Sequence, residues 1–238
     1  MRHRLVGLVS LAGSLLLTAA CAYHGDAGNP IARGLSWYSY LNGDDIRQRC
    51  TPGSPERYRF VYNGIYTEQV RSYDLTTNGQ GGHPALRVHV LGERGQIGDM
   101  PFDHPSALLA PWEGVDATVQ LRAVDIENLR NAMLSAGVFQ PLTERLELSS
   151  DTFYWVVTAC TDGAIRFNAF QWPSPRFEQA AFPDLLFAWD PSGIPVNPPR
   201  QARPSDIHRA QSPSDLREKV RFNVAASRDG LIGIGRLF

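Results

Sequence analysis

The sequence lacks the short motifs that mark three common kinds of active site. It holds no HExxH zinc motif, no GxSxG nucleophile elbow, and no glycine-rich phosphate loop that continues into Lys-Ser/Thr. The glycine-rich run at residues 79–82 has no such continuation and indicates a flexible loop. Two pairs of acids, Asp44-Asp45 and Glu144 with Glu147, are better explained as helix-end groups than as a glycosidase pair. We therefore expect no enzyme, and a cell-envelope hydrolase is the least favoured function.

Lysine is almost absent, and neither sign of charge is in large excess. The chain has 23 basic and 24 acidic residues, and Lys219 is its only lysine. Residues 1–20 contain two of the arginines and no acid, so the remainder carries 21 − 24 = −3. A weakly acidic chain argues against nucleic acid as a partner. Hydrophobic residues, at 43% of the chain, are enough for a folded core.

The only long hydrophobic run, Leu5–Leu17, is too short for an ordinary membrane span. It follows a basic start and precedes small residues, which is the three-part plan of an export signal. The ending Leu17-Thr18-Ala19-Ala20-Cys21 resembles the lipobox of bacterial lipoproteins, although Thr18 stands where leucine is more frequent. This resemblance covers the first two dozen residues and implies a signal peptide over residues 1–20. A plain secretory signal cut nearby is the alternative.

The resemblance also implies a location for the mature protein. Cys21 would become its first residue and carry the acyl chains, which hold a protein firmly on a membrane. Ala22 replaces the aspartate that is linked to inner-membrane retention. The expected location is therefore the periplasmic side of the outer membrane, with the inner membrane as the alternative. Residues 21–36, rich in Gly, Pro and Ala, would form a tether.

Cysteine is scarce, with three residues in the chain. Once Cys21 is assigned to the lipid anchor, only Cys50 and Cys160 remain, and an isolated pair in the oxidising periplasm favours a disulfide. This bond would tie the entry of the domain to a later hairpin. A catalytic thiol is the competing interpretation, but no local signature supports it. We expect no cofactor.

The strongest strand signal is the segment FYWVVTACTDGAIRFNAFQW, residues 153–172. Two apolar runs flank Asp162-Gly163, which is typical of a tight β-hairpin turn. Counting outward from the turn pairs Cys160 with Ile165, and Tyr154 with Gln171. Both faces are largely apolar, so we expect a central hairpin that is covered on each side.

Residues 57–75 predict a second hairpin with its turn at Asn63-Gly64. Counting outward pairs Tyr62 with Ile65. It also places Arg59 opposite Glu68 as an ion pair between strands.

Further elements follow this hairpin along the chain. Strands are expected over residues 86–90, with one face in solvent, and over residues 117–122. Residues 92–114 indicate a long loop. Asp125 is expected to cap an amphipathic helix that stops at Gly137.

Proline shapes the last quarter of the chain. Ser174-Pro175 begins a helical turn, and Pro183 prevents one continuous helix. Residues 191–213 are dense in Pro, Ser and Arg and predict an extended surface segment. The apolar segments at residues 220–224 and 231–238 could return to the sheet edge or add as strands to another protein.

These elements together predict an α+β domain over residues 37–190. We expect an antiparallel sheet of two or more hairpins packed with one amphipathic helix. A Pro-rich extension with a strand-like end would follow over residues 191–238.

His83, His89 and His104, together with Asp103, form the only group in the sequence that resembles metal ligands. His83 and His89 are an even number of residues apart, so one extended strand would place them on the same face. Pro84 lies between them, and no second histidine pair or cysteine pair accompanies them. A histidine on the solvent face of an edge strand explains the pattern better. A small-ligand or metal-binding module is nevertheless the second functional hypothesis.

Aromatic residues concentrate just after the tether and in the first hairpin. Trp and Tyr dominate protein interfaces, which makes this group a candidate docking surface as well as a source of core. The interface candidates are Trp37, Tyr38, Tyr40, Tyr62 and Tyr66. The favoured function is therefore an accessory or structural lipoprotein that docks on a protein complex.

Overall fold

The computed structural model describes residues 37–66, 68–78, 82–91, 114–201 and 222–235. They all belong to the unit Trp37–Phe238. The predicted signal peptide, Cys21 and the tether lie outside the described residues. None of the described helices is long and apolar enough to cross a membrane.

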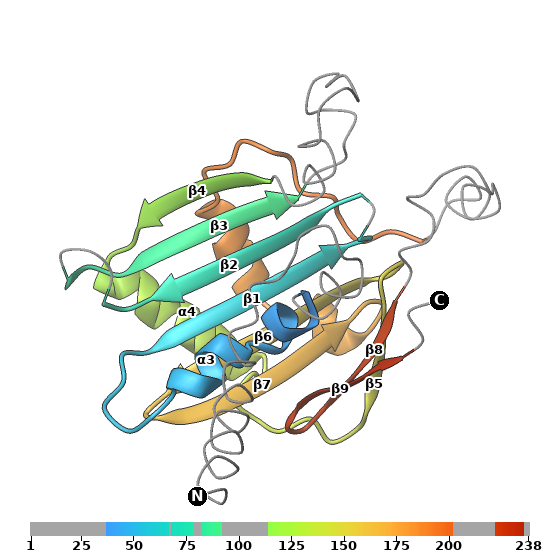
Figure 1. Ribbon diagram of the computed structural model, residues 1–238. Helices are drawn as coiled ribbons and strands as arrows, with labels where there is room; N and C mark the ends of the chain where they lie inside the picture. The colour runs from blue at the N-terminus through green and yellow to red at the C-terminus, as the bar shows by residue number, and fades with distance from the viewer. Residues whose placement is uncertain (1–36, 67, 79–81, 92–113, 202–221, 236–238) are drawn as a thin grey trace, which may run out of the picture. The chain divides into compact units, whose positions relative to one another are not determined.

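The described chain is broadly α+β and consists mostly of antiparallel sheet. The main sheet has six strands in the order β4-β3-β2-β1-β6-β7 (Figure 1). Its strands are β1 (Arg57–Gly64), β2 (Val70–Thr76), β3 (Ala85–Leu91), β4 (Val115–Gln120), β6 (Phe153–Thr161) and β7 (Ala164–Gln171).

Strands β6 and β7 pair in the register that the Asp162-Gly163 turn predicts, with Cys160 opposite Ile165 and Tyr154 opposite Gln171. Asp162 and Gly163 have φ angles of 53° and 71°, as this tight turn requires. Strand β6 is buried at every position except the last. Strand β7, by contrast, lies at one edge of the main sheet, so only one strand of this pair is central.

The register predicted for β1 and β2 is wrong. Arg59 lies opposite Asp74 rather than Glu68, and Phe60 lies opposite Tyr73. The Asn63 side chain is buried and donates to the backbone carbonyl of Ser150 at 3.0 Å, so Asn63 belongs to the strand and not to a turn. The observed register stacks aromatic residues of both strands on one buried face. That burial outweighs the local preference for a turn at Asn63-Gly64.

One face of the main sheet is covered by helices, with α4 lying behind the sheet in Figure 1. They are α4 (Ala123–Ser135), α5 (Pro175–Glu178) and α6 (Phe182–Ala188), rather than a single helix. Trp155 lies at the centre of this layer, with ring centroids 5.5 Å from both Phe182 and Phe187. As expected, Ser174 caps the short helix α5, and Pro183 lies at the start of a separate one.

Helix α4 begins earlier than the sequence indicates. Its N-cap is Arg122, and Asp125 is the third helical residue instead of the cap. The Asp125 carboxylate accepts the backbone N–H of Arg122 at 2.9 Å, which is how an acid at this position satisfies a free donor. The helix stops as predicted at Gly137, whose φ is 71°.

This contact gives a testable pH dependence. Hydrogen bonds from the Arg122 side chain and backbone lower the pKa of Asp125 to about 2. A lowered pKa contributes stability above the ordinary value of about 4, and this contribution is lost as the pH falls through about 2. We expect Asp125→Asn to lower the unfolding temperature by a few degrees at pH 7. The difference should close between about pH 4 and pH 2.

Thermal unfolding across this pH range measures the effect. Asp184→Asn is the matched control, because Asp184 is an exposed acid in the first turn of α6. It should change the unfolding temperature little. If the difference in unfolding temperature between Asp125→Asn and wild type stays constant down to pH 2, the carboxylate charge is not its cause.

Within the described part of the chain, the opposite face of the main sheet is covered only in part. Helix α3 (Asp44–Arg49) lies in front of it, and a second sheet lies beside β7 (Figure 1). This second sheet has the order β5-β8-β9, with β5 (Leu146–Ser149), β8 (Asn223–Ser227) and β9 (Gly230–Gly235). The C-terminal segments therefore pair with each other and with β5 rather than with an edge of the main sheet. Their apolar side chains share a core with β6 and β7.

The predicted disulfide is confirmed. Cys50 and Cys160 are bonded, with their Cα atoms 5.6 Å apart. Cys50 directly follows α3, and Cys160 lies near the end of β6. The bond therefore fastens α3 to the most buried strand of the sheet.

Residues 191–201 form no helix or strand, yet buried polar contacts hold them against β2. The Arg71 guanidinium is fully buried and donates to the Asp190 carboxylate, to the Ile194 carbonyl, and to Gln69 Oε1 at 2.8 Å. The Tyr73 hydroxyl donates to the same Asp190 oxygen at 2.9 Å. This part of the Pro-rich region is thus fixed to the domain.

Candidate functional site: the polar face of the sheet

Pairing across β1 to β4 places a continuous set of polar side chains on one face of the main sheet. The register aligns Arg59, Asp74, Arg87 and Thr118 in one row. The next row contains Ser72, His89 and Asp116. We call these seven residues the polar face. It is the face opposite to α4, because the alternate residues of the same strands belong to the helix-covered core.

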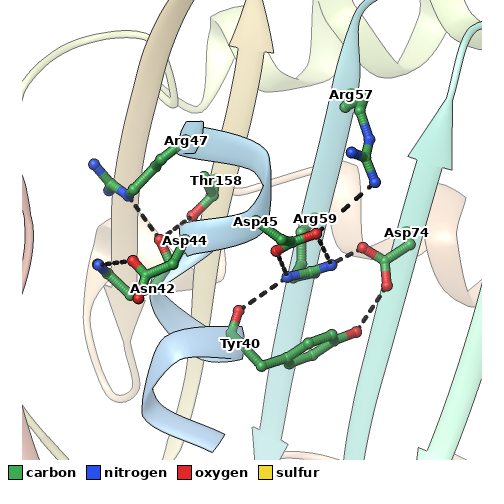
Figure 2. Close-up of polar contacts among 9 residues, drawn as sticks. All are labelled: Tyr40, Asn42, Asp44, Asp45, Arg47, Arg57, Arg59, Asp74 and Thr158. Atoms are coloured by element: carbon green, nitrogen blue, oxygen red, sulfur yellow. Dashed lines mark hydrogen bonds and ion pairs between the residues drawn. The ribbon is translucent and has the colours of Figure 1, made fainter. Parts of the chain in front are cut away.

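Arg59 forms the buried base of the polar face, where α3 meets β1 (Figure 2). Its guanidinium donates to Asp45 at 2.6 Å and to Asp74 at 2.7 Å. It also lies 3.8 Å from the centre of the Tyr40 ring, whose hydroxyl donates to Asp74 at 2.7 Å. Arg59 is 5% exposed, so these partners replace nearly all of its water. The network fixes α3 on the sheet and holds one border of the polar face rigid.

The ionisation of this network suits binding rather than proton transfer. Burial raises the pKa of Asp45, but hydrogen bonds and charge from Arg59 outweigh it, so the pKa lies below its ordinary value. Burial, and then the charge of Asp74, raise the pKa of the Tyr40 hydroxyl well above its ordinary value. Asp45 is thus an anion and Tyr40 a neutral donor at neutral pH. Neither group has a pKa near 7, where a general acid or base works best.

The outer part of the polar face is open to solvent. The side chains of Arg87 and Asp116 are 65% and 50% exposed, and they pair at 2.9 Å. His89 Nδ1 lies 3.3 Å from the same Asp116 carboxylate. Burial raises the pKa of Asp116, but hydrogen bonds and charge from Arg87 and His89 together outweigh it and lower the pKa below its ordinary value. Charged groups of both signs are therefore presented to solvent beside a hydrogen-bonded, buried Arg59.

The metal-ligand pattern is only partly assembled in the described residues. His83 is exposed and lies just before β3, while His89 lies on β3, and His104 falls outside the described residues. Within the described ranges, no three groups among His, Cys, Asp and Glu are placed to hold a metal ion. The His89–Asp116 pair supplies two ligand types at most. The metal hypothesis thus rests on a residue that the structure does not describe.

The aromatic interface candidates separate into two groups. Tyr62 is 1% exposed and donates from its hydroxyl to the Asn197 carbonyl at 2.6 Å. It belongs to the helix-covered core and offers no exposed docking surface. The other four are half-buried and pack against the core that β6 and β7 share with the second sheet: Trp37, Tyr38, Tyr40 and Tyr66. Of these, Tyr40 borders the polar face through Arg59.

The polar face itself was not identified from the sequence. Alternation in residues 86–90 indicates one solvent face on β3, but it does not show which charges lie beside it. Arg87 and Asp116 come together only because β3 pairs with β4 in a defined register. Comparisons with protein-family models, curated proteins and solved structures found no match for this chain.

Proposed function

We propose that this protein is a membrane-anchored periplasmic lipoprotein that acts as an accessory or structural subunit. It docks on a partner protein through the polar face. One observation carries the docking proposal: on this face the outer strands β3 and β4 present the exposed side chains of Arg87 and Asp116, whereas the same face of β6 and β7 is covered by other described segments. The anchor rests on the lipobox resemblance of residues 17–21.

The chemistry of the polar face suits a protein partner. Arg87, His89 and Asp116 present hydrogen-bond donors and acceptors on two neighbouring strands, and Arg87 and Asp116 carry charges of opposite sign. Complementary charges on a surface steer a partner and fix its orientation, which gives specificity more than affinity. The neighbouring Arg59 is buried and already paired with Asp45 and Asp74, so this border of the polar face needs no further ordering on docking. A hollow lined by Leu142, Glu144 and Arg145 lies among other elements and shares no residue with this face.

Reversing one charge tests the proposal. Arg87→Glu places two carboxylates side by side at residues 87 and 116, and we expect at least a tenfold loss of the co-purifying partner. The ion pair itself is exposed, so the variant should unfold within about 1 kcal/mol of wild type. The measurement is mass spectrometry of proteins recovered with the full chain after extraction in mild detergent.

Arg145→Glu is the matched control. Arg145 is 59% exposed and pairs with Glu147 at 2.7 Å on β5, away from the polar face. It should recover the partner as wild type does. Equal recovery with both variants would overturn docking by the polar face. The mass of the N-terminal peptide tests the anchor separately, because the proposal requires an acylated Cys21 as the first residue.

A further inference from the structure

Three of the four outer strands in the two sheets have edge groups that side chains already occupy. On β7, Ala169 donates its N–H to Asn168 at 2.9 Å and accepts from Arg176 at 3.1 Å. On β9, Leu231 donates to Asn42 at 2.9 Å and accepts from Tyr38 at 2.7 Å. On β5, the Glu147 carbonyl accepts from Gln171 at 3.0 Å. Such caps prevent an edge from pairing with another chain.

The fourth outer strand, β4, has no such cap among the described residues. Leu121 donates its N–H to the Pro84 carbonyl at 2.9 Å, which continues the ladder between β4 and β3. Backbone groups alternate in direction along an antiparallel strand. The N–H and C=O groups of Val115, Ala117 and Val119 therefore point toward β3. Those of Asp116, Thr118 and Gln120 point outward, and these three residues are exposed.

Strand β4 also has few of the other usual protections of an edge, and Asp116 is its one charged side chain. Residues 115–120 contain no proline, no lysine and no glycine. Their pairing with β3 is regular and has no bulge. A free regular edge of this kind is a template for another strand.

The sequence of β4 indicates which strand fits it. Read in both directions from Thr118, the segment VDATVQL at residues 115–121 is complementary to itself. An antiparallel copy centred on Thr118 would pair Asp116 with Gln120, an acceptor with a donor. It would also pair Ala117 with Val119, and Val115 with Leu121, on the apolar side. The two central threonines would face each other, which is a favourable cross-strand pair.

The charges permit this arrangement as well. The two Asp116 residues would lie at opposite ends of the paired segment, about 14 Å apart at ~3.4 Å per residue. That exceeds the screening length of about 8 Å in physiological salt. The outward groups of the two copies would form about six backbone hydrogen bonds.

We propose that β4 pairs antiparallel with β4 of a second copy of this chain, about a twofold axis at Thr118. The two six-stranded sheets then form one continuous sheet. Paired residues in such a ladder point to the same side, so the polar faces of both copies lie together on one surface. This proposal does not depend on the docking function or on the lipid anchor.

Sedimentation velocity of the full chain in mild detergent tests the proposal. Thr118→Pro removes the outward N–H and leaves the ladder to β3 intact, as an edge proline does. Thr118→Glu places like charges together at the axis but lies opposite Arg87 within each copy. Wild type should sediment as a dimer. Both Thr118 variants should have a dimer dissociation constant at least tenfold higher than that of wild type. Thr143→Glu, at an exposed position outside the strands, is the matched control and should remain dimeric.

A cross-linking variant locates the contact. With dissolved oxygen as the oxidant, Thr118→Cys should form an intermolecular disulfide, because hydrogen-bonded partners in a ladder have Cα atoms about 5.5 Å apart. Glu127→Cys, exposed on α4, should not. If Thr118→Pro fails to fold, as judged by circular dichroism, Thr118→Glu decides the test. A monomeric wild type, or a dimer that both Thr118 variants leave intact, overturns the proposal. A third outcome would also overturn the proposal. If wild type is monomeric in itself but is extracted with another protein, and both Thr118 variants lose that protein, then β4 pairs with a strand of the other protein.

Discussion

Replacing both Cys50 and Cys160 with alanine is expected to lower the free energy of unfolding by about 4–5 kcal/mol. The bond joins residues separated by 110 positions and closes a long loop, so in the chain-entropy model it restricts the unfolded chain strongly. It also holds α3 on the sheet beside β6. Denaturant unfolding of the oxidised wild type and of the double variant measures the difference. A loss of this size is a large share of the 5–15 kcal/mol that is typical of a folded domain.

Two comparisons separate the bond from side effects of the substitution. Wild type unfolded in the presence of a reductant should match the double variant. The single variant Cys160→Ala should be no more stable than the double variant, since either change removes the bond. An oxidised wild type and a double variant with the same unfolding midpoint would contradict the prediction.

Arg71→Met is expected to lower the free energy of unfolding by about 3–5 kcal/mol at pH 7. The side chains of Arg71 and Asp190 are 1% and 4% exposed, so removal of the guanidinium leaves a buried carboxylate without its cation. The Ile194 carbonyl loses a donor at the same time. Denaturant unfolding at several pH values measures the loss.

The pH dependence identifies the cause of this loss. In wild type, burial raises the pKa of Asp190, but hydrogen bonds from Ser192 and Tyr73 and the charge of Arg71 lower it below its ordinary value. Wild type therefore gains stability from Asp190 above about pH 4 and loses it as the pH falls further. Without Arg71 the buried carboxylate takes up a proton more readily. The deficit of Arg71→Met should consequently shrink as the pH falls from 7.

The double variant Arg71→Met/Asp190→Leu is the control. Replacing both members of a buried ion pair with apolar side chains is often neutral. It should recover most of the stability that Arg71→Met loses. A single variant within about 1 kcal/mol of wild type would show that the contact does not hold residues 190–201 in place.

Local sequence signals predicted an element correctly where the turn motif and the burial of the flanking strands favour the same pairing. The β6–β7 register follows from Asp162-Gly163 because both of its flanking runs are apolar and the turn accepts positive φ. The β1–β2 register could not be read in this way. Asn63-Gly64 has the same local signal, but burial of Phe60 against Tyr73 decides the pairing across a longer loop. A turn motif therefore predicts register only where the paired faces agree with it.

The candidate site was less predictable than the fold because its members are distant in the sequence. Arg59 is paired with both Asp45 and Asp74, and the three residues come from α3, β1 and β2. No local spacing brings them together, and only the sheet order and the position of α3 do so. Tyr62 was assigned to the candidate interface but is buried, since an aromatic residue suited to an interface is equally suited to a core.

The disulfide also determines how the domain would respond to mechanical force. A pull on the chain at residue 37 passes through α3 to Cys50 and then directly into Cys160 of β6. The load enters the sheet at an inner strand that is hydrogen-bonded on both sides, and not at an edge that can be peeled away. The residues between the two cysteines cannot extend while the bond is intact, which withholds roughly 360–400 Å of contour length. In the oxidised domain this length stays closed even when the sheet unfolds under force, whereas after reduction of the bond the same unfolding would release it.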